Sequence, residues 1–340
     1  MYSESDLDAA VTAGAISPAA AAALRAHVAA QRRSPAVDEE HFRLLTGFND
    51  IFVAVALALL LAAIGPIGAA ITPAMAGVGV AGAAWLLAEY FTRRRRMALP
   101  SILLLIAFVG GVVAAPFAAL ASIDPDYGDR VNAAIVAGIA LMGVAAAWVH
   151  WRRFMVPITV AAGALALTGA VVAVFFIIWP ETRDATLPVV LAAGLATFAL
   201  AMRWDMSDRT RTTRASDVAF WLHLAAAPLI AHPVFRLLGV FDGPVGPGIA
   251  AIVLALYMAF AVIALAVDRR ALLVSSLSYV LFALYQLFKG AGAVELGTAF
   301  TGLIIGSALL TLSAFWQPMR RRVVESLGNG IALRLPPVTA

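Results

Sequence analysis

Four ionisable side chains stand inside long apolar runs or at their ends: Glu89, His223, His232 and Arg236. Such a group is expensive in hydrocarbon, so it marks either a functional site or a specific partner. His223 and His232, the only histidines placed well inside a predicted span, are nine residues apart and face opposite sides of a straight helix. That spacing argues against a shared metal ion. Each is either a proton relay or, as the preferred interpretation, a hydrogen-bonded structural histidine; His232 shares its face with Arg236.

Glu89 is the carboxylate inside an apolar run, and Arg93 follows it by one helical turn. This order of charges favours an i,i+4 ion pair at the membrane boundary. The alternative is a carboxylate that couples proton movement to another event.

The apolar run over residues 271–290 carries a polar stripe that spans about 120° of a helix at 100° per residue. A polar face is unfavourable toward lipid, so it predicts contact with protein or water. One interpretation is a cavity or substrate path, and the other is hydrogen bonding between helices. The stripe consists of Ser275, Ser278, Tyr279, Tyr285, Gln286 and Lys289.

Soluble-enzyme motifs are absent from the sequence. It has no Walker A sequence, no G-x-G-x-x-G after a strand, no G-x-S-x-G and no H-x-x-x-H. The chain has no cysteine, which excludes disulfides, thiolate metal sites and thiol catalysis. We therefore predict no enzymatic activity, no catalytic residue, no cofactor and no metal.

The elements that position these residues are membrane spans. The chain of 340 residues is 62% hydrophobic and 13% charged, about half the ~25% charge of soluble domains. Apolar runs of ~20 residues recur, the length that crosses ~30 Å of hydrocarbon. The prediction is an all-α polytopic bundle of about ten spans: 51–71, 74–92, 98–121, 131–150, 155–179, 187–203, 217–240, 248–267, 271–290 and 296–316.

The topology is anchored by Arg93, Arg94, Arg95 and Arg96, which cannot lie in hydrocarbon and so mark one membrane face. With that face fixed, 20 of the 24 basic residues fall on the same side. The positive-inside rule then predicts that both termini are cytoplasmic. The bias toward Arg over Lys is typical of GC-rich bacterial coding sequences, so we expect a bacterial inner membrane. The net charge of +4 is explained by orientation and does not predict a nucleic-acid partner.

Three regions follow: a cytoplasmic helical segment over residues 1–48, the bundle over 49–316 and an interfacial cytoplasmic tail over 317–340. In the first, Gly14 separates two short helices with a narrow apolar seam, too small to fold around a core alone. The bilayer is the expected partner of the bundle. The hairpin within residues 1–33 either caps it without separate activity, or docks on a protein partner or a second copy.

A faint internal repeat accompanies the basic turns. Arg95-Arg96-Met-Ala-Leu-Pro100 and Arg152-Arg153-Phe-Met-Val-Pro157 open two spans, and Arg209 and Arg269-Arg270 continue the spacing at about 57–60 residues. The unit would be a two-helix hairpin. The alternative is that any series of tight hairpins repeats near this length.

The segments Leu7-Asp-Ala-Ala-Val-Thr-Ala-Gly14-Ala-Ile16-Ser17, Phe42-Arg-Leu-Leu-Thr-Gly-Phe-Asn49-Asp50-Ile and Arg334-Leu-Pro-Pro337 carry a resemblance. The chain resembles the uncharacterised bacterial membrane proteins called domain of unknown function 2157. The resemblance covers the ends better than the middle. It implies an inner-membrane protein with a cytoplasmic helical N-terminus, and no activity.

Two functions from different classes remain open. The first is a non-enzymatic scaffold, assembly or regulatory protein that docks through its N-terminal hairpin. The second is a secondary transporter of a small solute, with the polar stripe over 271–290 as its path.

Overall fold

The computed structural model describes residues 4–31, 48–123, 127–182, 185–209, 211, 213–241, 246–290, 294–332 and 335–337. The chain divides into two compact units, Met1–Arg43 and Leu44–Ala340. All regular structure in these described ranges is helical, which confirms the predicted all-α class. Predictions for residues 32–47, Arg183 and Arg334 lie outside the described residues.

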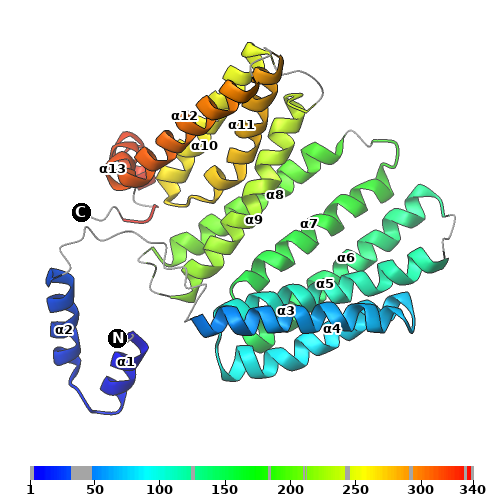
Figure 1. Cartoon of the computed structure of the whole chain (residues 1–340), viewed down its shortest axis with the longest axis horizontal. Coiled ribbons are helices and arrows are strands. Elements are labelled where there is room, and N and C mark those ends of the chain that lie inside the picture. Colours follow the sequence, from blue (N-terminus) through cyan, green and yellow to red (C-terminus); the bar gives the residue numbers. More distant parts are fainter. Residues whose placement is uncertain are drawn as a thin grey trace. The chain divides into compact units, whose positions relative to one another are not determined.

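The smaller unit holds the predicted helical hairpin, α1 (Glu4–Thr12) and α2 (Pro18–Gln31), seen in blue in Figure 1. The chain reverses at Gly14, whose φ of 72° lies in the left-handed region that glycine adopts without strain. Arg25 of α2 forms an ion pair with Asp8 of α1 at 2.8 Å. Both partners are substantially exposed, so this pair contributes little to the stability of the hairpin.

In the larger unit, nine helices of the described residues are long and apolar enough to cross a membrane, and large apolar side chains cover their outer surface. The chain is therefore a multi-pass membrane protein. The nine helices are α3 (Phe48–Ala69), α4 (Pro73–Ala88) with its continuation η1 (Glu89–Arg94), α5 (Ala98–Ile123), α6 (Asp129–Phe154), α7 (Ile158–Ile178), α8 (Thr186–Ser207), α9 (Arg214–Leu237), α10 (Pro247–Val267) and α11 (Ala271–Gly290).

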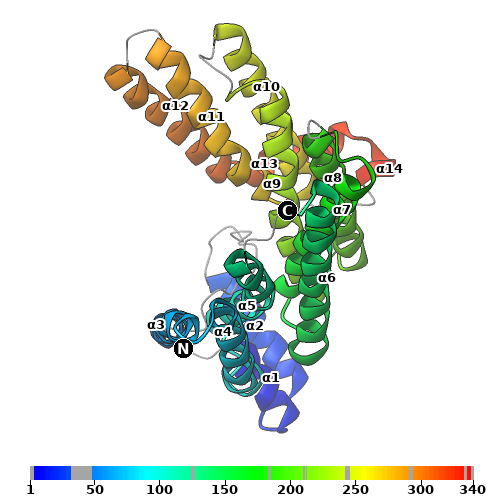
Figure 2. The same cartoon turned by 90° about the vertical axis from the view of Figure 1, so that its right-hand side faces the viewer.

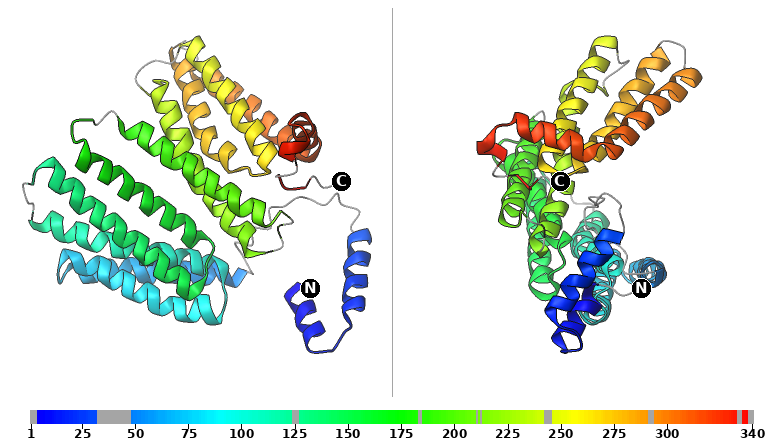
Figure 3. Two further views of the ribbon diagram at one scale, coloured as in Figure 1. Left: turned by 180° about the vertical axis from the view of Figure 1, so that it is seen from behind. Right: turned by 90° about the vertical axis from the view of Figure 1, so that its left-hand side faces the viewer.

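The last predicted span takes a different form. Helix α12 (Val294–Ala314) stops before residue 316, and α13 (Trp316–Ser326) turns away from it by 76°. The two count as a tenth span only when taken together. Figure 3 shows α13, in red, lying across the ends of α10 and α12. A short last helix, α14 (Asn329–Ala332), follows.

The three most extensive helix contacts are between helices joined by a basic turn: α4 with α5, α6 with α7 and α8 with α9. The fourth basic turn joins α10 to α11, which pack less extensively. Figures 1 and 2 show these helices packed side by side in chain order. Glycine permits two of the close approaches. A Cβ on Gly77 would lie 2.6 Å from backbone atoms of α5, and one on Gly194 would lie 2.8 Å from backbone atoms of α9. Small residues at such positions let helix backbones approach in a membrane.

Each of the four basic turns contains one non-glycine residue in the left-handed backbone region: Arg96, Met155, Arg211 and Asp268. Positions 96, 155, 211 and 268 are separated by 59, 56 and 57 residues. This spacing matches the predicted repeat. The same turn therefore recurs once per two-helix hairpin in its backbone as well as in its basic composition.

The four-arginine stretch itself is partly helical. Arg93 and Arg94 belong to the π-helix η1, Arg95 is its C-cap and Arg96 is the left-handed residue of the turn. Arg95 donates from Nε to the Tyr90 hydroxyl at 3.1 Å and its guanidinium lies over the Tyr90 ring. The wide π turn keeps these side chains exposed beside the end of α4.

Candidate functional site

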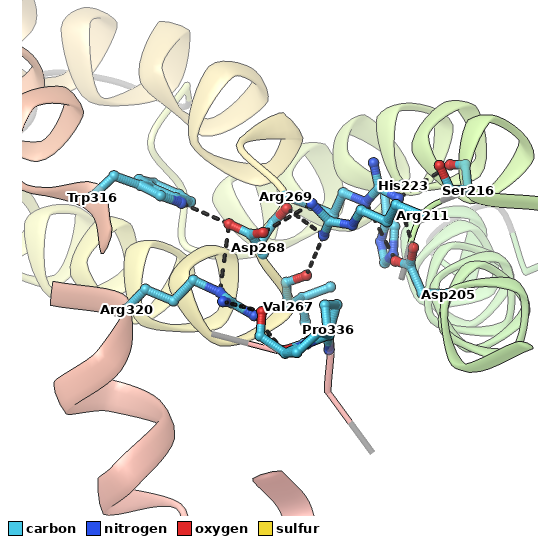
Figure 4. Close-up of polar contacts among 11 residues, drawn as sticks. Asp205, Arg211, Ser216, His223, Val267, Asp268, Arg269, Trp316, Arg320 and Pro336 are labelled. Atoms are coloured by element: carbon cyan, nitrogen blue, oxygen red, sulfur yellow. Dashed lines mark hydrogen bonds and ion pairs between the residues drawn. The ribbon is translucent and has the colours of Figure 1, made fainter. Parts of the chain in front are cut away.

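Asp205, in the last turn of α8, is the centre of a buried polar site and is only 1% exposed. His223 of α9 donates from Nε2 to Asp205 Oδ2 at 2.8 Å. Arg269, in the turn between α10 and α11, donates from Nη2 to Asp205 Oδ1 at 2.6 Å and to the Ser216 carbonyl oxygen at 3.1 Å. Figure 4 shows these side chains converging from three elements. The carboxylate is therefore paired on both oxygens.

Asp268, the neighbour of Arg269, forms the second half of the site. Its Oδ1 accepts from Trp316 Nε1 at 2.7 Å and lies 3.5 Å from Arg320 Nε, both on α13. Its Oδ2 accepts from Arg211 Nη1 at 2.8 Å. The left-handed backbone of Asp268 ends α10 and turns its side chain toward α13 (Figure 4).

We call the seven residues Asp205, Arg211, His223, Asp268, Arg269, Trp316 and Arg320 the aspartate cluster. It joins the ends of α8, α9, α10 and α13 through two buried carboxylates and three guanidinium groups. A buried charge is tolerated only when it is paired and hydrogen-bonded. The cluster therefore holds these helix ends in one arrangement, and loss of either aspartate would leave buried guanidinium groups without their carboxylate.

A second acid–arginine pair, with fewer members, has its carboxylate in η1, which continues the end of α4, just as Asp205 lies at the end of α8. Glu89 accepts from Arg93 at 3.2 Å, as predicted, but its shorter bonds come from Arg153 of α6. Arg153 donates from Nε to Oε1 at 2.6 Å and from Nη2 to Oε2 at 3.0 Å. The Glu89 and Arg153 side chains are 31% and 42% exposed. This pair therefore joins α4 to α6 where solvent or lipid headgroups screen it.

The two acid–arginine pairs are related by one shift along the chain. Glu89 and Asp205 are 116 residues apart, and so are Arg153 and Arg269. Gly77 and Gly194, which bring α4 to α5 and α8 to α9, are 117 residues apart. Two features of α4 to α7 therefore recur at nearly the same spacing in α8 to α11. The second acid–arginine pair differs from the first because it is buried and includes His223.

Of the four predicted ionisable residues, the structure brings only His223 into the cluster. His232 lies with Nδ1 3.1 Å from the Tyr279 hydroxyl, and Arg236 lies over the Phe241 ring. Within the described ranges, no three His, Cys, Asp or Glu side chains gather as a metal ion would require. His223 and His232 therefore act in separate surroundings.

The polar stripe of α11 is divided between different surroundings. Tyr279 contacts His232 and stacks on Phe235 with ring centroids 4.9 Å apart. Ser278 donates to the Ser275 carbonyl oxygen of its own helix at 3.1 Å. Gln286 is half-buried, whereas Ser278, Tyr285 and Lys289 are exposed on the surface of the bundle. An apolar groove of about 550 Å³ lies elsewhere, between α4, α5 and α6, and includes Trp85 and Phe108 in its walls.

Two further ionisable residues are buried near helix ends. Asp268 is covered by Trp316 and Arg320 in the aspartate cluster. The predicted span 131–150 ends at His150, but α6 continues to Phe154 and buries His150 fully. Its Nδ1 lies 3.1 Å from Thr159 Oγ1, and aromatic rings of α4, α5 and α6 surround it.

Asp205, Arg211, Trp316 and Arg320 were not singled out by sequence reasoning. Each of them has a partner in the cluster that lies 48 to 64 residues away along the chain, which the sequence of one helix does not indicate. The equal spacing of Glu89 from Arg153 and of Asp205 from Arg269 is the sequence signal that would have found the central pair.

No family model, curated protein or solved structure matches this chain. The possible roles of the aspartate cluster are therefore argued from its geometry.

Proposed function

We propose that this protein is a non-enzymatic membrane scaffold, assembly or regulatory protein that docks through its N-terminal hairpin. The observation that carries the proposal is that residues Met1–Arg43 form a compact unit of their own. Leu24 of α2 is 47% exposed, so its side chain is accessible for contact with another protein. The aspartate cluster is consistent with a fixed platform, since its charges are used to hold helix ends together.

Affinity purification of the tagged full-length protein in mild detergent tests the docking hypothesis. We expect a stoichiometric partner, or a second copy, that is lost when residues 1–33 are deleted. Leu24→Asp should release the same partner, whereas the matched control Ala23→Asp, at an exposed position beside it, should retain it. A partner that is retained by both the deletion and Leu24→Asp would contradict the proposal.

A bacterial inner-membrane location with both termini in the cytoplasm belongs to the same proposal. It is supported by the 20 of 24 basic residues that gather on one side. Membership of domain of unknown function 2157 also stays a prediction from the resemblance of the chain ends.

Cysteine labelling tests the orientation, since the chain has no native cysteine. Glu181→Cys, after α7, should react with a membrane-impermeant thiol reagent on intact spheroplasts. Arg94→Cys, three spans earlier, should react only after permeabilisation. Labelling of Arg94→Cys from outside would overturn the orientation.

A second candidate function is a secondary transporter of a small solute, with the polar stripe of α11 as its path. The specific observation in its favour is the buried Asp205–His223–Arg269 group, because ionisable residues inside membrane bundles commonly serve transport. Parallel repeats also occur in transporters, and the equal spacing of the two acid–arginine pairs would fit such a repeat of α4 to α7 in α8 to α11. The division of the stripe between packed and exposed positions makes this the weaker candidate.

A further inference from the structure

The last described segment of the chain, Leu335-Pro336-Pro337, is held by arginine side chains. Arg209, just after α8, donates from Nε to the Leu335 carbonyl oxygen at 3.0 Å. Arg320 of α13 donates from Nη2 to the Pro336 carbonyl oxygen at 2.6 Å and from Nη1 to that of Pro337 at 3.1 Å. Three successive carbonyl groups therefore accept charge-assisted hydrogen bonds from two guanidinium groups.

The Leu335 side chain is buried as well, at 5% exposure. It packs with Ala266 at the end of α10 and Val324 of α13, beside Met202 of α8 and Leu327. These walls come from three different helices. We call the surface formed by Met202, Arg209, Ala266, Arg320, Val324 and Leu327 the tail groove.

Proline suits this groove for a physical reason. Pro336 is buried and has no backbone N–H, so its carbonyl is the backbone polar group that burial must satisfy, whereas Pro337 is exposed. Arginine donors satisfy such carbonyls without requiring a strand or helix partner. Proline also restricts the chain before binding, which lowers the entropy cost of holding it extended.

One donor of the groove is also held by residues outside the tail. Arg320 is positioned by Asp268, to which its Nε lies at 3.5 Å, and Asp268 is fixed in turn by Arg211 and Trp316 (Figure 4). The aspartate cluster thus holds Arg320, which donates two of the three hydrogen bonds to the tail, in position.

We propose that the tail groove is a peptide-binding site for extended Leu-Pro-Pro segments, and that the chain's own C-terminal segment is its displaceable occupant. A partner protein that carries such a segment would bind by replacing the tail. Because the tail belongs to the same chain, it competes at a high effective concentration, so the groove is masked until the tail leaves it. This inference is independent of docking through the N-terminal hairpin.

The test uses the chain truncated after Ala332, reconstituted in nanodiscs, and a fluorescently labelled peptide of residues 330–340. Fluorescence anisotropy should show saturable binding to the truncated protein. Binding to the full-length protein should be weaker by about tenfold or more, because the tail competes. A Leu335→Asp peptide should also bind about tenfold more weakly or worse, because its carboxylate would enter an apolar pocket.

Substitutions in the groove provide the matched comparison. Arg209→Gln in the truncated protein should weaken peptide binding by about tenfold, the loss of a hydrogen bond from a charged donor. Arg203→Gln, which changes an exposed arginine of α8, should leave peptide binding unchanged.

Equal affinity of the peptide for truncated and full-length protein would overturn the proposal, as would equal binding of the wild-type and Leu335→Asp peptides. If the truncated protein fails to fold, full-length Leu335→Asp replaces it, since this substitution releases the tail while keeping the chain length. That variant should then bind the wild-type peptide, and failure to bind while folded would equally overturn the inference.

Discussion

Asp205→Ala is expected to lower the free energy of unfolding by about 3–5 kcal/mol, the cost of breaking a buried ion pair by removing one partner. The substitution leaves the Arg269 guanidinium and the His223 ring buried without their carboxylate. Thermal unfolding in detergent, followed by the far-UV circular dichroism of the helices, measures the loss as a lower midpoint temperature.

The control is Glu89→Ala, which removes the acid at the position 116 residues earlier in the chain. Because Glu89 and Arg153 are partly exposed, this change should shift the midpoint little. A third variant replaces Asp205, His223 and Arg269 together by Leu, Leu and Met. It should recover much of the lost stability, because no charge of this group is left buried without a partner, while Asp268 keeps its own arginine partners. Equal losses of stability in Asp205→Ala and Glu89→Ala would contradict the prediction, because they would show that burial does not determine how much an acid–arginine pair contributes to stability.

The spans were predictable because their signals are local. An apolar run of ~20 residues and the arginines that follow it can be read within one window of sequence. The pairing of Glu89 with Arg93 was predictable for the same reason, since one helical turn separates them. The stronger bonds from Arg153 were not, because Arg153 lies 64 residues further along the chain. Such a contact depends on which helices pack together, and the sequence of one helix does not contain that information.

The break between α12 and α13 has both a local cause in the sequence and a long-range cause in the fold. In a continuous helix, the nitrogen of Pro318 would have to donate to the Ala314 carbonyl, and proline has no N–H to do so. The helix ends at Ala314 and restarts at Trp316, with Pro318 near its beginning. Yet Pro66, Pro116, Pro228 and Pro233 lie inside α3, α5 and α9 without ending them. What fixes the break is long-range: Trp316 and Arg320 bind Asp268 only when α13 turns away from α12.

The second large effect is expected at Gly77, where α4 meets α5. A Cβ there would lie 2.6 Å from the Ala115 nitrogen and from the Gly111 carbonyl oxygen. Both are backbone atoms, so no side chain can rotate away, and the two helices must separate. Gly77→Ala should therefore lower stability by about 1–3 kcal/mol, the usual cost of overpacking, and Gly77→Leu by more. Thermal unfolding in detergent measures both.

Gly82, one and a half turns further along α4, is the matched control because a Cβ there would meet nothing within 4 Å. Gly82→Ala should leave stability unchanged or raise it by up to about 1 kcal/mol, the difference in helix propensity between the two residues. If the four-helix pattern is a true repeat, Gly194→Ala should behave like Gly77→Ala, since it would place a Cβ 2.8 Å from the Leu229 carbonyl carbon of α9. Loss of stability in Gly82→Ala alone would instead mean that glycine is needed in α4 for its backbone freedom. Losses at both Gly77 and Gly194, with none at Gly82, would locate the constraint in the two helix contacts that recur 117 residues apart.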